Sequence, residues 1–194
     1  IFAFLALLFF AFSEVVFAQD PAFTQFYGNP IYLNPAMAGS AYCPRIVMNH
    51  RNQWPNLKGA FVTTSFSYDK NVEELNGGVG FQVINDIQGE GALSNTQVNA
   101  LYAHQLQVNQ KVTILSGIQV GLHQRALDKT KLSFGDQIDP NYGFIYPTEE
   151  NIDQFGDNVS YADISLGFMA FTKKYFAGVA IHHLTEPEDA FIET

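Results

Sequence analysis

Hydrophobic and polar residues alternate along most of the chain from Arg45 onward, in segments of about ten residues separated by turn-forming residues. In 111–123, for example, Val112 and Val120 fall on one face and Gln119 falls on the other. A period of two residues is typical of a β-strand with two different faces. The pattern predicts seven strands, at 45–53, 59–69, 77–87, 96–109, 111–123, 160–172 and 174–184.

The connections between these strands indicate how the sheet is built. Joints at 109–110 and 173–174 are very tight, whereas 126–159 is long. Short turns alternating with long loops are typical of an outer-membrane barrel, with the turns on the periplasmic rim and the loops outside the cell. We therefore expect an extracellular loop at 126–159 and a periplasmic turn, longer than usual, at 70–76.

The predicted fold is all-β, an antiparallel outer-membrane β-barrel whose N-terminal part is residues 45–194. The polar faces of its strands carry amides rather than charges, as in Gln97, Asn99 and Gln107. Seven strands do not close a bacterial barrel, which has an even number of at least eight. We expect further C-terminal strands to complete it. A secreted acidic β-sandwich is the alternative, since its strands also alternate.

Composition favours the membrane class. Charged residues make up 15% of the chain and aromatic residues 14%, whereas ordinary soluble domains have about 25% charged residues. The formal net charge of −9 argues against nucleic acid as a partner. Outer-membrane lipid is the expected environment.

The first residues read as an export signal. Residues 1–12 are uninterrupted apolar side chains, and Val16-Phe17-Ala18 matches the small-x-small pattern that signal peptidase accepts. We expect a signal peptide at 1–18, truncated at its start and cleaved after Ala18. The apolar run is shorter than the about 20 residues of a transmembrane helix. Cys43 is the single cysteine, which excludes an internal disulfide.

Residues 19–44 separate the signal from the first strand and contain two Asn-Pro steps, Asn29-Pro30 and Asn34-Pro35. Proline removes a ladder donor and biases the preceding residue away from helix, so this segment is expected to form coil or turns rather than a strand. We expect it to lie at the periplasmic mouth or to plug the barrel lumen. A simple leader into the first strand is the alternative.

Two groups of polar residues outside that segment are candidate sites. Arg45 and Arg51 share one face of the first strand and either line the lumen or pair with Asp69 or Asp86 across the sheet. The second group lies in the long loop, since loops of that length are usually functional or disordered. Its candidates for partner contact or loop structure are Lys131, Phe134, Gly135, Asp136, Gln137 and Asp139.

Catalytic and cofactor sites are not expected. His123, Asp128 and Ser133 have the residue types of a Ser/His/Asp catalytic set, but nothing in their spacing requires the three side chains to meet at one site. The consecutive residues His182 and His183 are expected on opposite faces of a strand, where both cannot reach one metal. Asp136 and Asp139 with nearby carbonyls could supply oxygen ligands to Ca²⁺, although their motif is not an EF-hand loop. No nucleotide-binding motif is present.

Four blocks in the chain resemble the PorP/SprF family of type IX secretion system membrane proteins. They are QFYGNPIYLNPAMAGS (25–40), RNQWPNL (51–57), KLSFGDQID (131–139) and HHLTEP (182–187). The resemblance covers nearly the whole mature chain and implies an outer-membrane barrel that works with the secretion or gliding-motility machinery. Members of the family continue beyond the point where this sequence ends.

The function that follows is a non-enzymatic barrel subunit or a cargo-specific accessory of type IX secretion. The resemblance implies two kinds of partner, namely other secretion or gliding components and secreted proteins with a C-terminal sorting domain. A solute channel is the competing function, because a polar lumen also suits diffusion. An envelope-remodelling enzyme is a third alternative.

Overall fold

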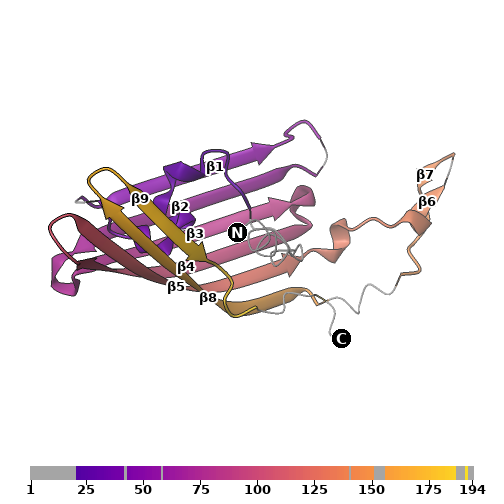
Figure 1. Ribbon diagram of the computed structural model, residues 1–194. Coiled ribbons are helices and arrows are strands. Elements are labelled where there is room, and N and C mark those ends of the chain that lie inside the picture. Colours follow the sequence, from indigo (N-terminus) through magenta and orange to yellow (C-terminus); the bar gives the residue numbers. More distant parts are fainter. Residues whose placement is uncertain are drawn as a thin grey trace, which may run out of the picture.

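Seven long strands form a single antiparallel sheet in which each strand pairs with its neighbours in chain order (Figure 1). The computed structural model describes residues 21–41, 43–57, 59–139, 141–150, 156–186 and 191. The expected signal peptide at 1–18 lies outside them. The strands are β1 (Arg45–Gln53), β2 (Phe61–Val72), β3 (Gly77–Gln88), β4 (Leu93–Gln107), β5 (Val112–Leu127), β8 (Asn158–Thr172) and β9 (Phe176–Ile181).

Short elements precede and connect these strands. Before β1 come η1 (Phe26–Gly28), α2 (Pro30–Leu33) and η2 (Pro35–Met37). The connections contain η3 (Glu73–Leu75), η4 (Gly89–Gly91), η5 (Lys129–Lys131), η6 (Gly135–Gln137) and the small hairpin of β6 (Ile138–Asp139) and β7 (Gly143–Phe144). Among the described residues, no helix is both long enough and apolar enough to span a membrane.

The all-β class, the seven strands and their antiparallel order are confirmed, and the sheet is a half-barrel. Several boundaries were wrong. The expected turn at 70–76 is shorter, because β2 continues to Val72 and only 73–76 connect it to β3. Asn76 closes this turn in the left-handed conformation, with φ of +48°, which asparagine tolerates better than most residues. The last strand also ends earlier, at Ile181.

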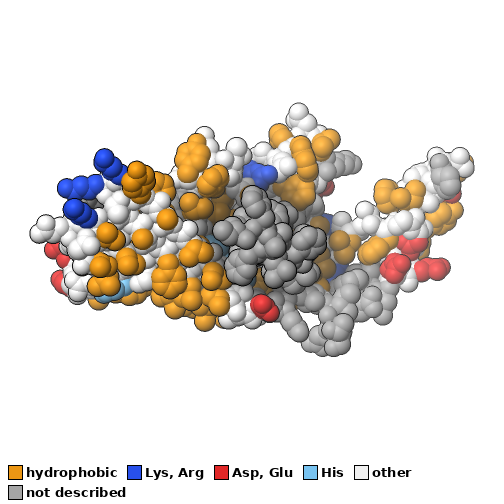
Figure 2. All heavy atoms as spheres, in the orientation of Figure 1, with side chains coloured by type: hydrophobic (Ala, Val, Ile, Leu, Met, Phe, Trp, Pro, Cys, Tyr) orange, Lys and Arg blue, Asp and Glu red, His pale blue; other side chains and the backbone are white. Residues whose placement is uncertain are grey.

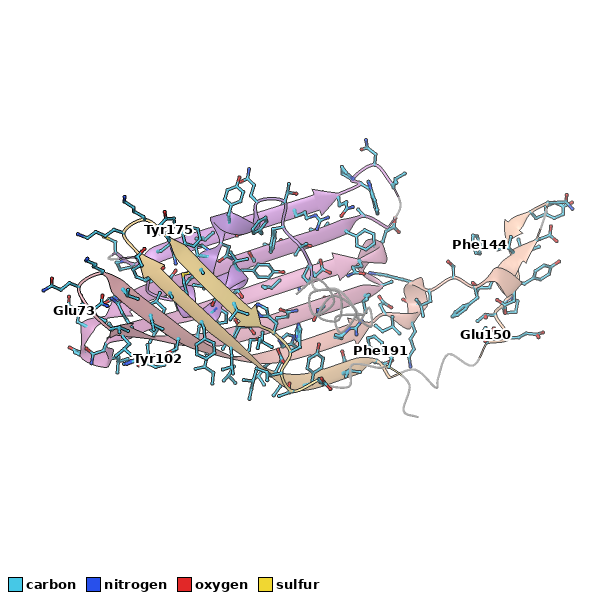
Figure 3. All side chains as sticks on the ribbon, viewed as in Figure 1. Glu73, Tyr102, Phe144, Glu150, Tyr175 and Phe191 are labelled. Atoms are coloured by element: carbon cyan, nitrogen blue, oxygen red, sulfur yellow. The ribbon has the colours of Figure 1, made fainter. Side chains whose placement is uncertain are left out.

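The two ends of the sheet differ mainly in the connection from β5 to β8, since the β3–β4 connection at the same end, 89–92, is as short as 73–76 at the opposite end. One end carries the short connections, where Glu73 and Tyr175 lie (Figure 3). Asn109 tightens one of these turns, since its Oδ1 accepts hydrogen bonds from the backbone N–H groups of Lys111 and Val112, both at 2.8 Å. The opposite end carries the connection from β5 to β8, which projects away from the sheet with Phe144 and Glu150 upon it (Figure 3).

The sheet exposes its apolar face and covers its polar one. On β5, Val120 is 49% exposed and Leu122 is 66% exposed, whereas Gln119 is 8% exposed and His123 is 3% exposed. Hydrophobic side chains are also spread over the surface that β8 and β9 turn toward the viewer in Figure 2. A water-soluble protein buries most of its large aliphatic side chains. The reverse arrangement is the one expected of barrel strands with lipid outside and a polar lumen inside.

This arrangement predicts the effect of a charge on the apolar face. Val120→Arg is expected to destabilise the folded protein in lipid by about 2 kcal/mol, because a cation near the bilayer midplane must be desolvated or drawn toward the interface. Denaturant unfolding in lipid vesicles measures the change. Phe144→Arg, at a residue 63% exposed on the projecting hairpin, is the control and is expected to change the stability by less than about 0.5 kcal/mol. Equal effects would contradict the assignment of the face.

Candidate functional site

The N-terminal segment, residues 21–41, lies against the polar face of the sheet (Figure 1). Both Asn-Pro steps begin a short helix, because Pro30 and Pro35 occupy first helical positions, where the missing N–H has no helical partner to lose. Asn29 is 1% exposed and Asn34 is 5% exposed. The segment is therefore packed and irregularly helical rather than a strand, and its contacts lie on the polar face.

Asn34 joins this segment to two strands. Its Nδ2 donates to the backbone carbonyls of Phe168 on β8, at 3.3 Å, and Val179 on β9, at 3.2 Å. Its Oδ1 accepts from the N–H of Ala36 at 2.9 Å and so caps η2. A single buried amide thus satisfies two carbonyls of the sheet and one amide of the segment.

A row of small residues makes room for the segment. The pairing places Gly78, Ala103, Gly117 and Gly167 opposite one another on β3, β4, β5 and β8. A Cβ at Gly117 would come within 2.3 Å of the Ala36 nitrogen. At Gly167 it would come within 2.1 Å of Asn34 Oδ1. Glycine inside a strand often marks close approach of another backbone, and sequence reasoning missed this signal.

Arg45 binds Asp69 and fastens the end of the segment. Its Nε and Nη2 donate to the two carboxylate oxygens of Asp69, each at 2.9 Å. The same carboxylate accepts from the N–H of Gly39 at 2.9 Å, and Arg45 Nη2 also donates to the carbonyl of Met37 at 3.3 Å. The pairing of Arg45 with Asp69 across the sheet is thus observed, and it lies beside the N-terminal segment.

Arg51 behaves differently from Arg45. It donates to the backbone carbonyl of Ala22 and to the side chain of Gln53. Asp86, the other carboxylate considered for this pairing, accepts from Thr63 Oγ1 at 2.5 Å and from Gln88 Nε2 at 2.7 Å. Both arginines thus contact the N-terminal segment.

The polar face also borders a cavity of about 570 Å³, which we call the lumen cavity. It lies between the N-terminal segment and β3, β4, β5, β8 and β9, and its lining includes Gln82, Asn99, Gln119, His123 and Asp163. His123 stacks on Tyr161, with ring centroids 5.1 Å apart. It also meets the edge of His183 at 5.9 Å.

Asp163 is held by the chain just after β9. Its Oδ2 lies 3.0 Å from His183 Nδ1, and its Oδ1 accepts from Thr185 Oγ1 at 2.9 Å. The expectation that His182 and His183 lie on opposite faces of a strand was wrong. The strand ends at Ile181 and His183 has φ of +56°, so both histidines line the cavity.

Asp128 and His123, two of the residues considered for catalysis, lie in different surroundings. Asp128 accepts from Thr130 and caps η5 at the end of the sheet, whereas His123 is stacked inside the lumen cavity. These two side chains have different partners. Within the described part of the chain, no group of three or more His, Cys, Asp or Glu side chains is arranged to hold a metal ion.

The projecting loop, residues 128–150, is ordered by its own side chains. Asp136 Oδ2 accepts from Thr148 Oγ1 at 2.9 Å and from the N–H of Glu149 at 2.7 Å. Gln137 Oε1 accepts from the N–H of Phe134 at 2.9 Å. Five apolar side chains of the loop are 48–79% exposed, namely Ile138, Tyr142, Phe144, Ile145 and Tyr146. The loop thus combines internal order with an exposed aromatic surface, beside which Figure 2 shows acidic groups.

Lys131 connects the base of this loop to the β3–β4 connection. Its Nζ donates to the carbonyl of Glu90 at 3.0 Å and lies 3.6 Å from Asp128 Oδ2. Asp139 forms an Asx turn, accepting from the N–H of Asn141 at 2.8 Å, and also accepts from Tyr146 OH at 3.1 Å. Gly135 begins η6 beside Phe134. The loop candidates are thus placed in loop structure, and contact with a partner stays a prediction.

The loop is expected to lose its local order in acid. Hydrogen bonds lower the pKa of Asp136, chiefly from the N–H of Glu149, and the pKa of Asp139, chiefly from the N–H of Asn141. A lowered folded-state pKa contributes stability above the unfolded value near 4, and this contribution is lost as pH falls through the folded value. Hydrogen exchange of 135–149, relative to unstructured peptides, should show protection at pH 7 that is lost as the pH falls below the unfolded value near 4.

Asp136→Asn provides the matched test of that expectation. It removes the ionised acceptor, so protection is expected to be lower already at pH 7 and to change less with acid. Protection in the unmodified protein that is independent of pH would contradict the role of these carboxylates.

Comparison with known proteins agrees with this geometry. The family model described as "Type IX secretion system membrane protein PorP/SprF" matches residues 15–193. The chain belongs to the PorP/SprF family. No curated protein and no solved structure matches it. The resemblance inferred from the four sequence blocks is confirmed.

Membership of the PorP/SprF family indicates the membrane location and the kind of partner expected for this sheet and its projecting loop. The family consists of membrane proteins of type IX secretion, and a half-barrel with an exposed apolar face is consistent with a place in the outer membrane. Involvement in type IX secretion suggests other components of that system as partners.

Proposed function

We propose that this PorP/SprF protein is a non-enzymatic outer-membrane barrel subunit, or an accessory for particular cargo proteins, of the type IX secretion and gliding machinery. The observation that carries the proposal is the exposed apolar face opposite a polar face filled by the chain's own N-terminal segment. A half-barrel filled in this way suits the holding of a partner better than free passage of solutes. Export through a signal peptide cleaved after Ala18 belongs to the same proposal.

The N-terminal segment is, in this proposal, a plug of the lumen. Asn29, Pro30, Asn34 and Pro35 lie within it, and Asn34 and Arg45 supply the hydrogen bonds to the sheet described above. A simple leader into β1 needs neither a glycine row nor a buried amide on two strands. Residues 21–41 should therefore resist protease in the intact purified barrel.

The projecting loop is the proposed contact for other secretion components or for secreted proteins with a C-terminal sorting domain. Its exposed aromatic side chains have the composition that is enriched at protein interfaces. Tyr142 is 79% exposed and Phe144 is 63% exposed, so both side chains are accessible to another protein.

The test is a comparison of secreted and surface-attached proteins between a parent strain and a strain deleted for this gene. Loss of one or a few large surface proteins supports a cargo-specific accessory. Collapse of all sorting-domain export supports a core subunit. An unchanged set of proteins would refute the secretion role and leave the solute channel, for which stable, size-selective conductance is the direct measurement.

Complementation of the deleted strain tests the loop. The double variant Tyr142→Ser and Phe144→Ser should fail to restore the missing proteins while reaching normal levels in the membrane, because both residues are exposed. Tyr175→Ser, at a residue 78% exposed at the opposite end of the sheet, is the matched control and should restore them. Full restoration by the double variant would remove the loop as a contact.

A further inference from the structure

The lumen cavity has the size of a small-molecule site and contains two buried amides that are incompletely bonded. Its volume of about 570 Å³ falls within the roughly 300–1,000 Å³ of ligand pockets. Gln82 on β3 and Asn99 on β4 lie directly opposite each other, and each is 1% exposed. Asn99 Nδ2 donates to Gln82 Oε1 at 3.3 Å.

One donor and one acceptor are left over by this pair. Among the described residues, Gln82 Nε2 and Asn99 Oδ1 have no hydrogen-bond partner. A buried polar atom without a partner costs about 1–3 kcal/mol, so a group that satisfies both atoms would bind favourably. A hydroxyl can accept from the first atom and donate to the second.

Gly121 holds the space in which Asn99 lies. It is the partner of Asn99 across β4 and β5, and a Cβ there would come within 2.2 Å of Asn99 Oδ1 and 3.0 Å of His123 Nε2. Any side chain at this position would push the amide out of place. The glycine therefore keeps the unsatisfied acceptor at the floor of the cavity, beside the stacked rings of His123 and Tyr161.

The remaining lining combines apolar side chains, neutral polar side chains and one carboxylate that already has partners. Ile84, Met169 and Phe176 also line the cavity, and such surfaces pack against the C–H groups of a ligand. The carboxylate of Asp163 is already engaged by His183 and Thr185. A charged ligand would thus have to displace an existing interaction, whereas a neutral ligand would not.

We propose that the lumen cavity binds a short neutral oligosaccharide through the Gln82 and Asn99 amides. A single sugar hydroxyl can accept a hydrogen bond from Gln82 Nε2 and donate one to Asn99 Oδ1. The C–H faces of the sugar ring can pack against the aromatic and aliphatic side chains of the lining. A peptide presents its N–H and C=O on different atoms, so it fits the adjacent donor and acceptor less well. This binding goes beyond the proposed role in secretion and does not depend on it.

Saturation-transfer NMR on the full-length protein in nanodiscs tests this proposal. The probes are maltotriose and N,N′-diacetylchitobiose, with tri-alanine as the peptide probe. We expect saturation of the ring protons of at least one sugar and about a tenfold weaker Kd for Gln82→Leu, the size of one hydrogen bond. Gln107→Leu, on the same strand as Asn99 but exposed and outside the cavity lining, should bind like the unmodified protein.

Asn99→Leu provides a second variant in case Gln82→Leu does not fold, and far-UV circular dichroism checks both. Absence of transfer to both sugars would overturn the proposal. So would transfer that is unchanged in a folded Gln82→Leu or Asn99→Leu protein, or transfer to tri-alanine that competes with the sugars. Because this binding is measured on purified protein, its failure is separate from a negative result in the secretion experiment.

Discussion

Replacing Gly117 by valine is expected to expel the N-terminal segment from the sheet. A Cβ at this position would come within 2.3 Å of the Ala36 nitrogen and 2.4 Å of the Pro35 carbonyl carbon. Both neighbours are backbone atoms, so no side-chain rotation relieves the overlap. Overpacking typically costs 1–3 kcal/mol and occasionally more. We expect the packed state of the segment to lose at least about 3 kcal/mol, because an entire backbone stretch must move.

Limited proteolysis and hydrogen exchange of residues 29–40 in the purified barrel measure this effect. Cleavage within the segment should accelerate strongly, while the protection of β4 and β5 is retained. Gly80→Ala is the matched control, because the nearest atoms to its Cβ would be side-chain carbons of Ala38 and Leu101, both at 3.4 Å, and of Asp69, at 3.6 Å. A segment that stays protected in the Gly117→Val protein would show that the glycine row does not seat it.

Asp69→Ala should destabilise the protein by about 3 kcal/mol. Asp69 is 2% exposed and Arg45 is 24% exposed, and the carboxylate accepts two hydrogen bonds from Arg45 and one from the N–H of Gly39. Removing one partner of a buried pair leaves the other charge uncompensated, which costs about 3–5 kcal/mol. The lower figure applies here because part of the guanidinium reaches solvent.

Denaturant unfolding in lipid vesicles measures the loss, with Lys129→Ala as the control. The Lys129–Asp157 pair is 2.8 Å apart but Asp157 is 71% exposed, and exposed pairs contribute about 0–1 kcal/mol. Hydrogen exchange should also show Gly39 losing its protection in Asp69→Ala. Equal losses for the two variants would mean that the Arg45–Asp69 pair is no stronger than a surface contact.

The periodic part of the fold could be predicted because successive side chains of a strand point to opposite faces, so hydrophobic and polar residues alternate in the sequence. The alternation around Gln119 predicted both the strand and the polarity of its two faces, and the family blocks predicted the kind of membrane protein. Boundaries were less certain, since residues such as Lys70 and Asn71 read as turn formers and yet pair with Val79 and Gly78 in the sheet.

The site was only partly predictable. Arg45 and Asp69 were identified as possible partners because opposite charges on adjacent strands can pair across a sheet, and the pairing of these two residues is observed. The Arg51 contact with Ala22 was missed, since it depends on where an irregular segment lies. His182 and His183 were placed by assuming that the last strand continued, but it ends at Ile181.

The sequence by itself thus determined the strand order, the two faces of the sheet and the family, because local periodicity and contiguous motifs carry that information. Only the tertiary structure decided that Gly78, Gly117 and Gly167 form one row beneath the N-terminal segment, and that Gln82 and Asn99 share one buried pair of amides. These contacts join residues tens of positions apart. They are fixed by the register of neighbouring strands and by close backbone packing, which no local pattern encodes.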